Sequence, residues 1–144
     1  MLFLDEQLLD LAFQSVQHHK SGSFFPGPPE QQLIAQNWPA IRQELSKIDL
    51  DTFAGYQACE MFAPKGRLNI RRVAQLHPYD LILYTALVLK LRDGITANRI
   101  AATDNAVFSY RAEGAASHLL YNREPNFTSY KERLKEALHR GLIF

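Results

Sequence analysis

The sequence predicts an α+β fold that is mostly helical and carries one β-hairpin. Apolar residues recur at helical spacing near the N-terminus, and residues 81–91 form an almost wholly apolar segment. Between these two regions, short segments of strand-like composition flank the turn Pro64-Lys65-Gly66. A chain of 144 residues has the length of one domain, so residues 1–144 are predicted to fold as a single domain.

A first helix is predicted in residues 1–20, where apolar residues recur every three or four positions and share one helical face. Residues 21–30 (SGSFFPGPPE) are rich in Gly, Pro and Ser and predict a connector. Residues 31–144 then form the body of the domain. Its first helix has an apolar stripe that continues through Pro39, where the missing backbone N–H predicts a kink or a restart. The stripe consists of Ile34, Trp38, Ile41, Leu45 and Ile48.

The hairpin is predicted from two short strands, Gln57–Ala63 and Arg67–Val73. Gly66 suits the turn between them because glycine adopts positive φ without steric cost. Four residues at or after this turn are basic, namely Lys65, Arg67, Arg71 and Arg72, so the hairpin is predicted to have a basic tip.

The most strongly predicted helix follows the hairpin. Pro78 suits the first helical turn, and the carboxylate of Asp80 suits the positive end of the helix dipole. Gly94 is predicted to cap the far end. Because residues 81–91 are apolar on nearly all sides, this helix is predicted to be central and buried.

The C-terminal part is predicted to contain one extended segment and one helix. Residues 105–112 (NAVFSYRA) have the composition of an extended segment. Ser129 and Glu132 have the spacing of a capping box and predict a helix that begins at Ser129. Gly141 is predicted to end it.

Composition narrows the class of protein. The chain has 16 Lys and Arg against 15 Asp and Glu, so a local anion explains its basic hairpin better than a global attraction to nucleic acid or membrane. Cys59 is the only cysteine, which excludes an intrachain disulfide. The longest apolar run is shorter than the roughly 20 residues that span a bilayer. The N-terminus carries acids where a signal peptide needs bases, so a cytoplasmic protein without a membrane span is predicted.

No complete catalytic or metal site is predicted. His18 and His19 are adjacent, so on a helix they point about 100 degrees apart and do not share one metal. Cys59 is interpreted as a small apolar strand residue. Asp49 and Asp51 lie where a helix ends and are predicted to make turn and cap hydrogen bonds.

The basic hairpin is the candidate site. Lys65 lies at its tip, and alternation along the second strand puts Arg71 on one face and Arg72 on the other. Arg72 follows an apolar row, so its charge is predicted to need a defined partner. Converging cations suit a phosphate group, since arginine offers forked donors and lysine a point charge. The alternative is a solvated edge strand whose cations discourage aggregation.

The order of PKG, the paired arginines, HPYDLILYTALV and VFSYR resembles the N-terminal fingers region of bacterial reverse transcriptases, in particular the non-intron group associated with phage defence. The resemblance covers Phe62 to Arg111. It implies that Lys65 and Arg71 or Arg72 reach the triphosphate of the incoming nucleotide. Val73 stands where a proline commonly follows the family's arginine, so both arginines stay candidates.

The resemblance also implies that Tyr110 and Arg111 touch the template or the nucleotide, and that the fold is the fingers part of a right-hand polymerase. Polymerase chemistry needs palm aspartates that hold two metal ions, and the sequence contains no adjacent aspartates. The expected function is therefore the nucleotide- and template-proximal fingers portion of an RNA-directed DNA polymerase, inactive alone. Its partners would be an RNA template, a dNTP and a palm domain, with Mg²⁺ expected only when the palm is present. The alternative is a stand-alone, non-catalytic module that binds RNA or protein.

Overall fold

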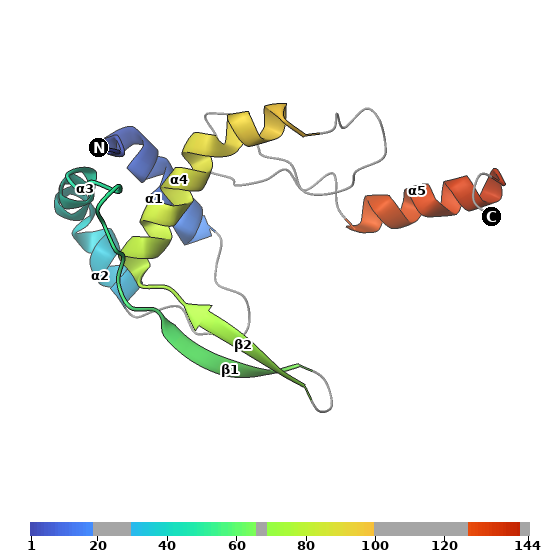
Figure 1. Ribbon diagram of the computed structural model, residues 1–144, viewed down its shortest axis with the longest axis horizontal. Coiled ribbons are helices and arrows are strands. Elements are labelled where there is room, and N and C mark those ends of the chain that lie inside the picture. Colours follow the sequence, from blue (N-terminus) through green and yellow to red (C-terminus); the bar gives the residue numbers. More distant parts are fainter. Residues whose placement is uncertain (19–29, 66–68, 100–126, 142–144) are drawn as a thin grey trace. The chain divides into compact units, whose positions relative to one another are not determined.

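The computed structural model describes residues 1–18, 30–65, 69–99 and 127–141, which form five α-helices and one two-stranded antiparallel sheet (Figure 1). The predicted α+β class, mostly helical with one hairpin, is confirmed for these residues. The chain divides into two compact units, Met1–Lys90 and Leu91–Phe144. No helix of the described residues combines the length and apolar content that crossing a bilayer requires.

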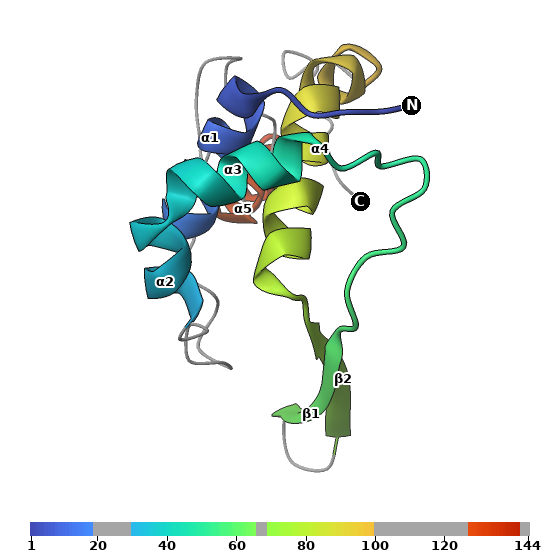
Figure 2. The same cartoon turned by 90° about the vertical axis from the view of Figure 1, so that its left-hand side faces the viewer.

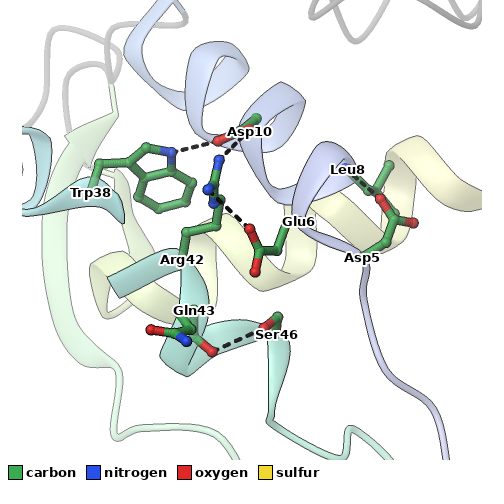
Figure 3. Close-up of polar contacts among 8 residues, drawn as sticks. All are labelled: Asp5, Glu6, Leu8, Asp10, Trp38, Arg42, Gln43 and Ser46. Carbon is green, nitrogen blue, oxygen red and sulfur yellow. Dashed lines mark hydrogen bonds and ion pairs between the residues drawn. The ribbon is translucent and has the colours of Figure 1, made fainter. Parts of the chain in front are cut away.

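The first unit begins with three helices, α1 (Glu6–His18), α2 (Glu30–Gln36) and α3 (Trp38–Ser46). Asp5 caps α1 with its side chain, because its Oδ1 accepts the backbone N–H of Leu8 at 2.7 Å (Figure 3). The predicted interruption near Pro39 is confirmed: α2 ends before Asn37, and Pro39 lies at the start of α3, where its missing N–H breaks no helical bond.

Helices α1 and α3 pack side by side through one aromatic and ionic cluster (Figure 2). The rings of Phe13 and Trp38 stack with centroids 4.1 Å apart, and Trp38 Nε1 donates to Asp10 at 2.7 Å. Arg42 joins Asp10 at 2.7 Å and Glu6 at 2.9 Å, as Figure 3 shows. One arginine therefore fixes two acids of α1 against α3.

The hairpin consists of β1 (Cys59–Lys65) and β2 (Asn69–Gln75). In its register, Cys59 lies opposite Gln75 and Lys65 opposite Asn69. Both strands start two residues later than predicted, so Pro64 belongs to β1 and not to the turn. Proline is tolerated there because β1 is an edge strand, where one missing donor need not break the ladder.

Helix α4 (Pro78–Ala97) begins at Pro78 and carries Asp80 in its first turn, as predicted. The predicted cap at Gly94 is wrong, because the helix continues to Ala97. Its end is held instead by Asn98, whose backbone N–H and side-chain Nδ2 both donate to the Gly94 carbonyl, at 3.3 and 2.8 Å. Asn98 thus satisfies the Gly94 carbonyl, which is one of the last carbonyls of the helix.

The buried apolar residues of α4 are Ile82, Leu83, Ala86 and Leu89. The prediction that this helix is central and buried holds for one face only, because Tyr84 is 61% exposed and Leu91 is 58% exposed. An apolar sequence without periodicity does not reveal which face lacks a neighbour. The described apolar core lies wholly in the first unit. Its other members come from α1, α2, α3, β1 and the residues before α1: Leu4, Leu9, Ala12, Ile34, Leu45 and Ala63.

The second unit contains α5 (Phe127–His139). The prediction that α5 begins at Ser129 is wrong by two residues, so Ser129 lies inside the first turn and is not the cap. Gly141 follows the helix with φ of 65°, as expected of the glycine that ends it. The predicted extended segment 105–112 and most of the connector 21–30 lie outside the described residues.

Candidate functional site

Lys65 is the last residue of β1 and lies opposite Asn69, the first residue of β2. The two strands therefore bring this lysine to the end of the ladder next to the turn. The predicted position of Lys65 at the tip of the hairpin agrees with this register.

Arg72 has the defined partner that the sequence predicts. It lies on the same face of the hairpin as Glu60, and its Nη2 and Nε atoms lie 2.6 and 3.1 Å from Glu60 Oε2. Both side chains are exposed, so the pair contributes at most about 1 kcal/mol to stability. The forked contact joins β2 to β1 and fixes the orientation of the Arg72 guanidinium.

Arg71 lies on the opposite face, paired in register with Ala63. Its side chain is exposed, and within the described part of the chain it makes no hydrogen bond or ion pair. The sequence left both arginines as candidates for a phosphate contact. The structure separates them, because Arg72 already has a carboxylate and Arg71 does not.

The face that carries Arg72 is also apolar and exposed. Phe62 lies directly opposite Arg72 and is 75% exposed, and Ile70 is 73% exposed on the same face. Sequence analysis did not select Phe62, although the register that pairs it with Arg72 places both on one surface. A large exposed aromatic residue beside a cation is suited to stacking or to a protein contact.

The base of the hairpin is clamped by residues that lie just outside its two strands. Tyr56, which precedes β1, stacks on His77, which follows β2, with ring centroids 4.2 Å apart. The backbone N–H of Tyr56 donates to Asp80 Oδ2 at 2.7 Å. Phe53 and Tyr79 meet the ring of Tyr56 edge-on. We call Tyr56, His77 and Asp80 the base clamp.

Gly55 lets the chain enter this clamp. Its φ is 76°, and a Cβ atom at this position would lie 3.5 Å from Asp80 Oδ2. Glycine adopts that φ at little cost, whereas other residues are strained there. Asp80 is therefore more than the dipole-compatible acid that the sequence predicts, because it ties the segment before β1 to the first turn of α4. Tyr56 and His77 could not be selected as a pair from the sequence, because only the fold brings them together.

The remaining candidates have structural roles. Asp49 Oδ1 accepts the backbone N–H of Asp51 at 3.1 Å, which confirms the predicted turn bond for Asp49. It also accepts the backbone N–H of the distant Leu2 at 2.9 Å, and the carboxylate of Asp51 pairs with the N-terminal ammonium group instead of making a cap bond. Cys59 is an exposed residue of β1. His18 ends α1, while His19 lies outside the described residues. Over the ranges that the structure covers, no three acids, histidines or cysteines come together in a group able to hold a metal.

Tyr110 and Arg111 also lie outside the described residues, so their predicted contact with template or nucleotide stays a prediction. The site that the structure describes consists of the hairpin cations, the exposed face around Phe62 and the base clamp. In comparisons with known proteins, no family model, no curated protein and no solved structure matches the chain.

Proposed function

We propose that the chain is the nucleotide- and template-proximal fingers portion of an RNA-directed DNA polymerase. One observation carries the proposal: Arg71 is exposed and has no partner among the described residues, on a hairpin whose β1 ends at Lys65. A cation that is left without a carboxylate is available to an anion from outside the chain. The triphosphate of an incoming nucleotide is such an anion.

The two arginines have different roles in this proposal. Arg71 and Lys65 contact the triphosphate, Arg71 with a forked pair of donors and Lys65 with a point charge. Arg72 stays on Glu60 and stiffens β2, so that its neighbour Arg71 is presented in one direction. The base clamp keeps the two ends of the hairpin together. The chain then binds and orients the nucleotide, while a palm domain would supply the metal-holding aspartates.

A second function, a non-catalytic module that binds RNA or protein, is favoured by the exposed face around Phe62 and Ile70. Such a module would use the aromatic ring and the neighbouring cation for stacking, which does not require a triphosphate. The two proposals therefore differ in the ligand that the hairpin prefers.

The test compares dATP with deoxyadenosine in titrations of the isotope-labelled chain, followed by the backbone amide resonances of Asn69 to Arg71. The fingers proposal expects shifts with dATP and none with deoxyadenosine at equal concentration. Equal shifts with both molecules, or none with dATP, contradict it. If RNA alone produces shifts at Phe62 and Ile70, the module is the better description.

A further inference from the structure

A pocket of about 360 Å³ lies in the first unit, and no residue of β1 or β2 lines it. Helix α2 and the residues up to Ile41 of α3 form one wall, and the start of α4 forms the other. Its volume falls in the range of about 300–1,000 Å³ that is usual for ligand sites. The residues that line it are Glu30, Leu33, Ile34, Asn37, Ile41, His77, Pro78 and Tyr79.

Apolar side chains dominate the lining. Ile34 is buried beneath the pocket, while Leu33 at its rim is 61% exposed. An apolar group of an occupant that packs on Leu33 would remove this surface from water, which is favourable.

The polar groups of the pocket are mainly acceptors. Asn37 uses its side-chain Nδ2 to donate to the Leu33 carbonyl at 2.9 Å, which leaves its Oδ1 as an acceptor. Glu30 is the one charged residue among those lining the pocket, and it has no hydrogen-bond or ion-pair partner among the described residues. A carboxylate and an amide oxygen call for an occupant that donates, and the negative charge favours a cation.

His77 supplies the one histidine donor. Its Nδ1 accepts the backbone N–H of Tyr79 at 3.2 Å, so in the neutral ring the proton is on Nε2. An N–H donor matches a carbonyl acceptor of the occupant. A peptide can supply all three matching groups: an apolar side chain, a cationic side chain and a backbone carbonyl.

We propose that this pocket binds a peptide segment of a partner protein in which an apolar side chain is followed by a basic one. The apolar side chain packs on Leu33 and Ile34. The basic side chain pairs with Glu30, and a backbone carbonyl accepts from His77. The site uses none of the hairpin cations, and it shares only His77 with the base clamp.

Two substitutions test the cation contact and the apolar contact separately. The probe is acetyl-phenylalanyl-arginine amide, titrated into the labelled chain and followed at the amides of Leu33 and Tyr79. Glu30→Gln keeps the size of the side chain and removes the charge, and should weaken binding about two- to fivefold, as expected for an exposed ion pair. Leu33→Ala removes apolar contact and should also weaken binding. The control is Glu132→Gln, the same change of charge on α5, which should leave the affinity unchanged.

Two altered peptides complete the design. Replacing arginine by glutamine in the peptide should lower its affinity for the wild-type chain. The affinity of this glutamine peptide should then be the same for Glu30→Gln as for wild type. Replacing phenylalanine by alanine should weaken binding roughly tenfold, because most of the apolar contact is lost. The proposal is overturned if the original peptide shifts neither amide, if the arginine and glutamine peptides bind equally, or if Glu30→Gln and Glu132→Gln have the same effect.

Discussion

The backbone N–H of Tyr56 donates to the carboxylate of Asp80 at 2.7 Å, across the base of the β-hairpin. Tyr56 precedes β1 and Asp80 lies in the first turn of α4, so this one bond connects the entry of the hairpin with the helix that follows it. The Tyr56 and His77 rings stack at the same place. The orientation of the hairpin cations therefore depends on residues that do not belong to either strand.

Replacing Asp80 tests the contribution of the base clamp to stability. Asp80→Ala removes the acceptor of the Tyr56 N–H and the acid in the first turn of α4. Hydrogen bonds to charged groups contribute about 1.5–3 kcal/mol, and solvent near Tyr56 reduces the loss, so a decrease of about 1–2 kcal/mol in the free energy of unfolding is expected. Urea denaturation measures it. Glu132→Ala is the control, because Glu132 is an exposed acid of α5 without a hydrogen-bond or ion-pair partner among the described residues, so its loss should cost under about 0.5 kcal/mol.

Gly55 provides a second test of the clamp by a different mechanism. Gly55→Ala puts a Cβ atom at positive φ, close to Asp80. Such a conformation costs of order 1 kcal/mol or more for a residue other than glycine. Gly94→Ala serves as the control: nothing lies within 4 Å of its added Cβ, and alanine favours the interior of α4, so this variant should be slightly more stable than wild type. Equal melting temperatures for the two variants would contradict the described backbone of residue 55.

The two faces of α4 are expected to respond differently to truncation. Ile82 is 1% exposed, so Ile82→Ala should destabilise the chain by about 2–5 kcal/mol through lost contacts and a cavity. Leu91 is 58% exposed, and Leu91→Ala should cost less than about 0.5 kcal/mol. Thermal melting monitored by circular dichroism distinguishes them. A large loss in Leu91→Ala would mean that this side chain is covered in solution.

The proposed function also predicts how RNA binding depends on salt. Removing one cation that contacts phosphate should weaken binding to single-stranded RNA about equally for all sequences, and should reduce the slope of log affinity against log salt by about one unit. Arg71→Ala should show this effect. Arg72→Ala should show less of it, because Arg72 is already paired with Glu60. Fluorescence anisotropy at several salt concentrations gives both slopes, and identical slopes for Arg71→Ala and wild type would contradict the prediction.

The chain of 144 residues should incorporate no nucleotide on a primed template with Mg²⁺ or Mn²⁺, because its sequence contains no adjacent aspartates to hold the two metal ions. Primer extension with highly purified protein checks this. Reproducible extension that follows the protein through each purification step would show that a different set of residues carries out the chemistry.

Local sequence patterns predicted much of the fold: apolar periodicity indicates α1, and Pro78 and Asp80 are local signals for the start of α4. The predicted ends of α4 and β1 were wrong because contacts outside the local sequence pattern determine them. Asn98 extends α4 past Gly94, and an edge position lets β1 include Pro64. Composition did not show that Tyr84 lies on an uncovered face.

The candidate site was predictable only in part for the same reason. The cations could be selected from the sequence, and alternation separated Arg71 from Arg72. The partner of Arg72 could not be identified, because Glu60 becomes its neighbour only in the observed register. The base clamp joins Tyr56, before β1, to His77 and Asp80, after β2. No short sequence motif indicates a contact between residues so far apart in the chain.

The proposed contact between Arg71 and a triphosphate is tested by measuring dATP affinity in variants that each lack one arginine. Wild type, Arg71→Ala, Arg72→Ala and the control Arg140→Ala, which removes the same charge beyond α5, are titrated with dATP under identical salt. Arg71→Ala should weaken binding about tenfold or more, as expected for a charge-assisted hydrogen bond, whereas Arg140→Ala should match wild type. Arg72→Ala should show a smaller loss than Arg71→Ala. Wild-type affinity in Arg71→Ala, or a greater loss in Arg72→Ala, would show that Arg71 is not the arginine that binds the triphosphate.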